Sequence, residues 1–187
     1  MASIITATTT SGLTQSADNS GVLQLASGTG NLVTVPSVTG TAMVSGNMPT
    51  FSASMSGNQS VTNASFTKVQ FSVENWDTAN CYDPTTNYRF TPNVAGYYMV
   101  NLGLDAGNSS SASRCVPSIY KNGSAIRNGT NIAPGSGGFT YSGNISAQVY
   151  MNGTTDYIEG YVYVAGTSPT VTASPNSFFD AVLVRAA

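Results

Sequence analysis

The chain has 187 residues, of which 41% are hydrophobic and only 7% are charged, with a formal net charge of −2 and no histidine. Roughly a quarter of the residues in an ordinary globular domain are charged, so Ser, Thr, Asn and Gly supply most of the polarity here. Without a basic patch, nucleic acid is not an expected partner, and no apolar run reaches membrane-spanning length. The missing histidine excludes Ser-His-Asp and Cys-His catalysis and histidine-containing metal sites.

The first 48 residues form a distinct segment, with no aromatic residue and a single charged residue, Asp18. Two short apolar pieces, residues 22–25 and 31–35, alternate with Gly, Ser and Thr and predict small strands or an extended arm. Such a segment buries little surface alone, so we expect it to dock on its own globular domain, on sister subunits or on another protein. Its start lacks the features of a secretory signal. We expect an anchoring arm over residues 1–48 and a globular domain over 49–187.

From residue 49 onward the pattern changes to regularly spaced strands. Apolar and polar residues alternate over 67–73, 139–151 and 157–164, which predicts half-buried β-strands. Residues 178–184 are almost continuously apolar, which predicts a strand buried on both faces. These segments favour strands over helices throughout the domain.

Turn signals separate the predicted strands. The dipeptides Asn122-Gly123 and Asn152-Gly153 favour type I′ turns, so we expect two hairpins of one sandwich. Residues 131–138 are rich in glycine and contain Pro134, which indicates an exposed loop. No segment has helical periodicity over more than about two turns. The fold class is therefore all-β, a sandwich or jelly roll.

One stretch carries a family resemblance: Phe90-Thr-Pro-Asn-Val-Ala-Gly96-Tyr97-Tyr98-Met99-Val100. It resembles the signature of the complement C1q-like domain, a member of the TNF-like jelly-roll superfamily. In that pattern a Phe is followed after five residues by Gly and then by alternating aromatic or apolar positions. Upstream, Phe71, Asp77 and Tyr82 also match in spacing, although the gap from Tyr82 to Phe90 is one residue longer. Val100 and Leu102 stand where aromatic residues are usual.

The resemblance covers about residues 49–185, because the run 178–184 is similar to the family's last strand. Family members form compact trimers whose inner sheets pack around a three-fold axis, so the resemblance implies a homotrimer. It also places the last strand and the strand after Gly96 in the inner sheet. The residues that it assigns to the core or the trimer contact are Phe90, Gly96, Tyr98, Val100, Phe179, Ala181 and Leu183.

The remaining chemistry of the chain is sparse. Cys81 and Cys115 are either reduced, small apolar residues or a single disulfide, and the sequence leaves both open. Asp77, Asp83 and Asp105 could offer oxygen ligands to calcium, as in some family members, but their spacing fits no metal loop. We expect them to be solvated turn residues, and we expect no metal, no cofactor and no enzymatic activity.

The lack of a collagen-like Gly-X-Y stalk before the domain departs from the animal complement proteins. The short Gly/Ser/Thr arm and the terminal Leu-Val-Arg-Ala-Ala resemble C1q-like virion proteins of tailed bacteriophages. This resemblance implies a non-enzymatic virion protein that is assembled in the host cytoplasm. Its implied role is that of a trimeric capsid decoration (cement or head-fibre) protein, which binds the major capsid protein or another virion protein through residues 1–48. The alternative is a tail-fibre or receptor-binding tip that recognises cell-surface glycans through loops 74–87 and 131–138. In that case Trp76 and Asp77 form the candidate receptor-binding loop, where the indole stacks on a sugar; otherwise Trp76 is a rim or core residue. A host-cell adhesin or secreted lectin is a third option, which the missing secretory signal disfavours.

Overall fold

The computed structural model describes strands β1 (Leu23–Ala26) and β2 (Leu32–Val35), Met43, Gly46, and residues 48–107, 114–131 and 141–187. The chain divides into two compact units, residues 1–41 and 42–187. In the first unit β1 and β2 pair antiparallel, with Leu23 opposite Val35. These strands coincide with the two short apolar pieces of the sequence. Apart from Met43, Gly46 and Met48, the rest of the proposed arm lies outside the described residues, and its anchoring role stays a prediction.

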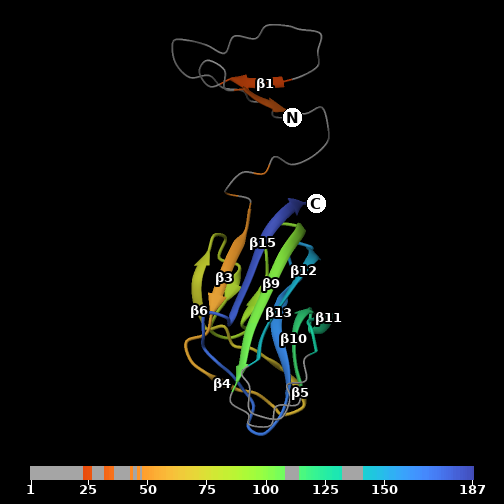
Figure 1. Ribbon diagram of the computed structural model, residues 1–187. Helices are drawn as coiled ribbons and strands as arrows, with labels where there is room; N and C mark the ends of the chain where they lie inside the picture. Colours follow the sequence, from red (N-terminus) through yellow and green to blue (C-terminus); the bar gives the residue numbers. More distant parts are fainter. Residues whose placement is uncertain are drawn as a thin grey trace. The chain divides into compact units, whose positions relative to one another are not determined.

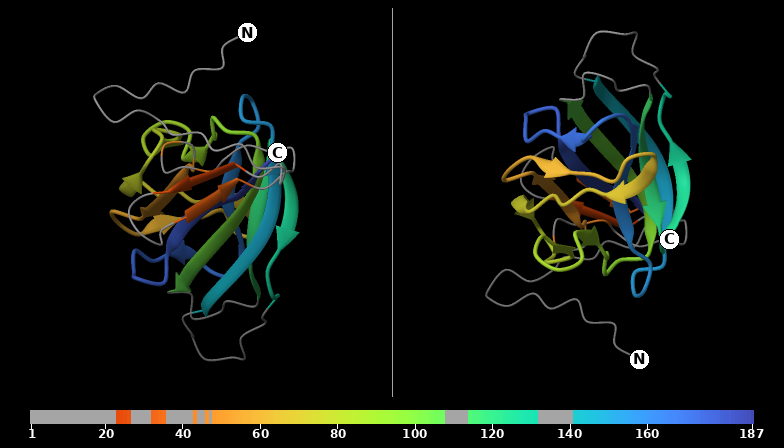
Figure 2. Two further views of the ribbon diagram at one scale, coloured as in Figure 1. Left: turned by 90° about the horizontal axis from the view of Figure 1, so that it is seen from above. Right: turned by 90° about the horizontal axis from the view of Figure 1, so that it is seen from below.

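The second unit contains two antiparallel sheets, as expected for a jelly-roll sandwich (Figures 1 and 2). One sheet has seven strands, of which six follow the order β4-β14-β9-β15-β3-β6. Strands β15 and β14 pair with successive parts of one edge of β9, and β12 pairs with the opposite edge. The second sheet has the order β11-β10-β13-β8-β7. No α-helix occurs in the described residues, and none of their segments could cross a membrane as a helix. The strands are β3 (Thr50–Ser54), β4 (Gln59–Ser60), β5 (Ser65–Lys68), β6 (Val73–Asp77), β7 (Tyr82–Asp83), β8 (Arg89–Phe90), β9 (Gly96–Gly107), β10 (Arg114–Lys121), β11 (Ser124–Asn128), β12 (Tyr141–Met151), β13 (Ile158–Ala165), β14 (Thr170–Val171) and β15 (Phe178–Ala186).

The core lies between the sheets and is centred on Phe51 of β3. Its ring stacks on Tyr82 and Phe90 of the five-stranded sheet at centroid distances of 4.6 and 4.5 Å. It also meets Phe179 of β15 edge-on at 5.1 Å. Stacked and edge-on aromatic pairs add to the stabilisation that burial alone provides. One side chain therefore joins strands of both layers.

The seven-stranded sheet is organised around β9, which pairs with β12 on one side and with β15 on the other. Tyr98 lies opposite Leu183, so the last strand and the strand after Gly96 pair in one sheet, the sheet in which the resemblance placed both. Gly96 lies where a Cβ atom would come within 2.4 Å of the backbone oxygen of Arg185. A side chain at this position would separate β9 from β15, so the close approach of the two backbones requires glycine here.

The predicted strand over residues 67–73 is wrong in its extent, because two strands replace it. Val69 and Phe71 are buried as predicted, but they lie between β5 and β6. The Val69 N–H donates to Gly160 of the five-stranded sheet, whereas β6 pairs with β3 of the other sheet. The chain crosses between layers here, and it keeps the period-two burial pattern while it changes partners. The strands over 141–151 and 158–165 confirm their predicted alternation.

Of the two predicted hairpins, only the first is correct. Asn122 and Gly123 have positive φ (51° and 77°) and connect β10 directly to β11, as a type I′ turn requires. Asn152-Gly153 instead begins a crossing from β12 to β13, which belong to different sheets. The Asn152 Oδ1 atom accepts hydrogen bonds from the backbone N–H groups of residues 154, 155 and 156. This side-chain cap lengthens the turn, which the dipeptide alone does not reveal.

Candidate interaction surface

Strand β15 has one buried and one exposed face. Phe179, Ala181 and Leu183 are buried in the core, whereas Val182 and Val184 are 40% and 51% exposed. The prediction that this strand is buried on both faces is therefore wrong for a single chain. The apolar run reflects two different surfaces, because the second set of side chains lies on the outward face of the seven-stranded sheet. We call this outward face the open face.

One half of the open face carries large apolar side chains, together with Gln148 of β12 opposite Met99 and Arg185 of β15 opposite Tyr97. Tyr97 of β9 and Tyr150 of β12 are directly opposite each other, 48% and 44% exposed, with ring centroids 5.4 Å apart. Val182 of β15 lies opposite Met99 of β9. Large exposed apolar groups clustered on one surface are uncommon unless the surface binds something. We call the set Tyr97, Met99, Tyr150, Val182 and Val184 the apolar patch.

A row of polar side chains crosses the open face next to the apolar patch. The row follows the pairing of Ser146 with Asn101, of Asn101 with Asp180, and of Asp180 with Ser52. The Ser146 hydroxyl donates to Asn101 Oδ1 at 2.7 Å, and the Asn75 amide donates to Ser52 Oγ at 3.1 Å. The row thus takes one polar side chain from each of five neighbouring strands: β12, β9, β15, β3 and β6. We call this set the polar row.

Asp180 is the member of the polar row whose carboxylate is not fully hydrogen-bonded. Its Oδ1 atom is buried and has no hydrogen-bond partner among the described residues. Burial raises the pKa of the Asp180 carboxyl above its usual range, and a hydrogen bond with Ser52 offsets part of this effect. A buried carboxylate oxygen without a donor destabilises the charged form.

We therefore expect the substitution Asp180→Asn to change how stability depends on pH. Since the pKa is higher in the folded chain than in the unfolded chain, the stability that Asp180 contributes is complete below the unfolded pKa and is lost as pH rises through the folded pKa. The amide that replaces the carboxyl cannot ionise, so the variant should lose less stability than the original chain as the pH rises through the range in which Asp180 ionises. Urea unfolding of both proteins at matched concentrations, pH by pH, measures this difference. Parallel curves would show that Asp180 titrates normally.

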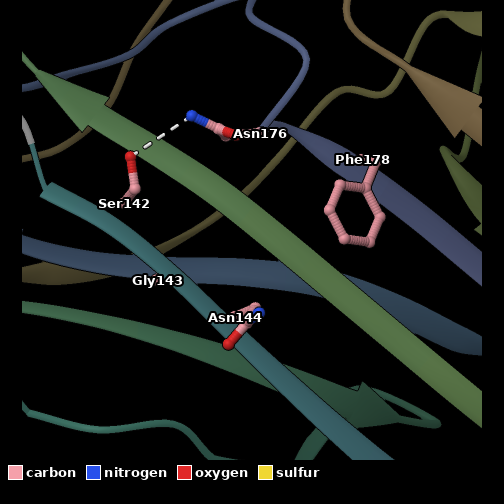
Figure 3. Close-up of a pocket in the computed structure, with 5 residues that line it drawn as sticks. All are labelled: Ser142, Gly143, Asn144, Asn176 and Phe178. Carbon is pink, nitrogen blue, oxygen red and sulfur yellow. Dashed lines mark hydrogen bonds between the residues drawn. The ribbon is translucent and has the colours of Figure 1, made fainter.

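A small pocket lies at the other end of the open face (Figure 3). It has a volume of about 140 Å³. In Figure 3, Ser142 and Asn144 lie on β12, on one side of β9. Phe178, the first residue of β15, and Asn176, two residues before it, lie on the other side. Asn144 and Phe178 are both opposite Gly103 of β9. The lining residues are Ser142, Gly143, Asn144, Asn176 and Phe178.

A buried carboxylate holds the frame of this pocket. Asp105 is 8% exposed, and its two oxygens accept the hydroxyl hydrogens of Ser142 and Ser174 at 3.1 and 3.0 Å. Its backbone N–H donates to Ser177 Oγ at 3.0 Å, and its backbone oxygen accepts the N–H of Thr172 at 2.7 Å. These hydrogen bonds hold the segment before β15 against β9, so the walls of the pocket are fixed in place.

The residues assigned to core or trimer packing lie in the core of the single chain. Phe90, Tyr98, Val100 and Phe179 are 0% exposed, and Ala181 and Leu183 are 1% exposed. Their side chains therefore face the opposite sheet and are absent from the open face. The residues that sequence reasoning missed are their immediate neighbours along the strands, such as Tyr97 and Val182. The signal was available, because β-strand side chains alternate between faces.

The candidate receptor-binding residues are separated by the same alternation. Trp76 lies opposite Ser52 in strand β6, whereas the sequence indicated a loop, and it is 53% exposed. The Asp77 carboxylate accepts hydrogen bonds from the backbone N–H groups of Ala79, Cys81 and Tyr82. It is therefore committed to its own turn. Most of loop 131–138 lies outside the described residues.

The cysteines and the other carboxylates have structural surroundings. Cys81 and Cys115 are not bonded to each other, and burial raises the pKa of the Cys115 thiol to about 12. Backbone N–H groups of Thr85 and Thr86 hold the pKa of Asp83 well below its usual range. No group of three or more potential metal-ligating side chains occurs in the described part of the chain. Asp83 is thus a turn residue as expected, whereas Asp105 is a buried one.

Comparison with known proteins depends on the fold, since no protein-family model and no curated protein matches the sequence. The structure of Eiger TNF from S. frugiperda matches with a TM-score of 0.56 at 13% identity, over 75% of this chain and 93% of that chain. The globular domain of zebrafish complement 1qA matches with a TM-score of 0.53 at 13% identity, over 74% of this chain and 98% of that chain.

The fold is a TNF/C1q-like jelly roll. This confirms the resemblance read from Phe90 to Val100. The open face thus belongs to the sheet that contains β9 and β15 of the TNF/C1q-like jelly roll. The PRD1 vertex protein P5 covers 91% of this chain at 14% identity with a TM-score of 0.49, which is too low to support a conclusion.

Proposed function

We propose that this chain is a non-enzymatic structural protein that forms a homotrimer through the apolar patch of its open face. The observation that carries the proposal is the exposure of Tyr97, Tyr150, Val182 and Val184 on one half of a sheet. Burying such a patch releases water from apolar surface. Arg185 and Lys121, which lie beside Tyr97 and Tyr150, would have to keep their charges at the rim of the contact. The number three is supported by the resemblance to TNF/C1q-like jelly rolls, whose members trimerise through the inner sheet.

We further propose that the trimer decorates a viral capsid and binds it through residues 1–48. The support is the composition of this segment, which has no aromatic residue and one charge in 48 residues. An arm of this kind gains stability only against a neighbouring surface. The major capsid protein or another virion protein would provide that surface, and the jelly rolls would point outward.

A tail-fibre or receptor-binding tip remains the second candidate, and one observation favours it. Trp76 is 53% exposed on an edge strand of the open-face sheet, where an indole can stack on a sugar ring. A tip protein would have a fibrous partner in place of a flat lattice. Localising the protein in an electron-microscopy map of the virion separates the two candidates.

Removal of residues 1–41 tests the decoration role, because this cut falls between the two compact units. We expect the remaining chain to sediment as a trimer while its binding to capsids falls by at least about 100-fold, since the contact is proposed to lie in the removed segment. Co-sedimentation with virions stripped of the protein measures binding. The full-length chain is the control. Decoration by the truncated trimer would contradict the proposal.

A further inference from the structure

The pocket on the open face has an uncharged lining. Its side chains are one hydroxyl, two amides and one aromatic ring, from Ser142, Asn144, Asn176 and Phe178. The charge nearest to it, on Asp105, is 8% exposed, and each of its carboxylate oxygens already accepts a serine hydroxyl. A charged ligand would find no opposite charge in this lining. The lining therefore favours a neutral, polar molecule.

The hydrogen bonds around Asp105 determine what the pocket offers. Ser142 donates its hydroxyl hydrogen to Asp105 Oδ1, so the lone pairs of Ser142 Oγ remain as acceptors. The Asn176 amide donates to this oxygen over a long 3.5 Å distance, which leaves its own oxygen available. Asn144 is exposed and forms no side-chain hydrogen bond to another residue of the described chain. The pocket thus presents both donors and acceptors that a ligand can use.

Phe178 supplies the apolar wall of the pocket. Gly103, opposite it on β9, has no side chain, and a Cβ atom there would lie 2.3 Å from Cε1 of the Phe178 ring. The ring therefore leans over the backbone of β9 and remains partly exposed. An aromatic wall beside amide groups matches a molecule with one apolar and one hydroxylated side.

We propose that this pocket binds a neutral pyranose sugar. The C–H face of the sugar ring packs on Phe178, and its hydroxyl groups bond to the amides of Asn144 and Asn176 and to Ser142 Oγ. The volume of about 140 Å³ accommodates one ring, so the ligand is a terminal sugar residue of a glycan. This site is distinct from Trp76, which lies on β6 at the far edge of the sheet.

The pocket and the apolar patch occupy different parts of the open face. Along β9 the patch includes Tyr97 and Met99, the polar row includes Asn101, and the pocket is at Gly103. The polar row thus separates the two surfaces. Sugar binding goes beyond the structural role proposed above and does not depend on capsid attachment, so either proposal can fail alone.

The test uses the full-length chain and a panel of methyl glycosides: glucose, galactose, mannose, N-acetylglucosamine and N-acetylgalactosamine. Saturation-transfer NMR detects binding, and titration gives Kd, which we expect on the order of 1 mM for a single sugar residue. Asn144→Ala should weaken binding about tenfold, because it removes one amide that bonds to the ligand. Asn144 is exposed, so its loss should leave thermal unfolding unchanged. Gln148→Ala is the matched control, since Gln148 is an exposed amide on the same strand and face, outside the pocket. Because Gln148 lies opposite Met99 of the apolar patch, the sedimentation of this variant is measured alongside its sugar binding.

Binding of at least one glycoside that is lost in Asn144→Ala and kept in Gln148→Ala supports the proposal. Failure of all five glycosides to bind overturns it. Binding that Asn144→Ala leaves unchanged and Trp76→Ala removes would move the sugar site to Trp76 and overturn the pocket. If Asn144→Ala instead alters sedimentation and no glycoside binds, a second copy of the chain fills the pocket, and the proposal is again overturned.

Discussion

Replacing Val182 by Asp should convert the assembled protein into monomers. Val182 is 40% exposed in the single chain and lies in the middle of the apolar patch, opposite Met99. In the proposed trimer each copy would bury an aspartate in the apolar contact, and a buried charge that is not paired costs about 3–5 kcal/mol. A loss of this size corresponds to at least a hundredfold weaker association. Sedimentation velocity at micromolar concentration should show the shift from three times the 19.3 kDa subunit mass to that of one subunit.

The matched control for this experiment is Ile126→Asp. Ile126 is also β-branched and 39% exposed, but it lies on β11 at the edge of the five-stranded sheet. Ile126→Asp should leave the trimer intact. Both variants should fold, since neither side chain contributes to the core. If Val182→Asp stays trimeric, or if both variants dissociate equally, the apolar patch is not the specific contact between copies.

The second large effect is expected in the core. Phe51→Ala should lower the free energy of unfolding by about 3–5 kcal/mol, because it removes a fully buried ring and leaves a cavity. The ring contacts Tyr82, Phe90 and Phe179, so both sheets lose packing. Chemical denaturation followed by circular dichroism measures the loss.

Phe66→Ala provides the comparison for the core variant. Phe66 is 37% exposed and contacts Tyr120 and Tyr163 on the outward side of the five-stranded sheet. Its removal should cost about 1 kcal/mol. Equal losses in the two variants would show that Phe51 is not the centre of the core.

The fold could be predicted from the sequence because its long strands keep a strict period of two. Residues 141–151 place Ile145, Val149 and Met151 on one buried face, as the alternation predicts. The prediction failed where a side chain decides the backbone path. Asn152 caps three backbone N–H groups and turns an expected hairpin into a crossing between sheets. Such a cap depends on side-chain geometry that the dipeptide Asn-Gly does not encode.

The site was harder to predict than the fold. The family resemblance identified residues such as Tyr98 and Leu183, which are buried in the single chain. Their outward neighbours were within reach of the same alternation. The pocket was not, because it depends on Asn144 and Phe178 both meeting Gly103, and these residues are far apart in the sequence. Long-range register of this kind is set by the assembled sheet.

The two Asn-Gly turns also contact each other. Asn122 donates from its amide to Asp156 at 2.8 Å and accepts the N–H of Tyr157 at 2.9 Å, and Lys121 pairs with Asp156 at 2.7 Å. The turn between β10 and β11 of the five-stranded sheet is therefore bonded to the connection that leaves β12 of the seven-stranded sheet. Exposed turns are usually the places where a protein tolerates an epitope tag or an extra loop. At this end of the sandwich such an insertion would break the hydrogen bonds and the ion pair that join the two sheets. An insertion that the protein tolerates therefore has to be placed elsewhere on the surface.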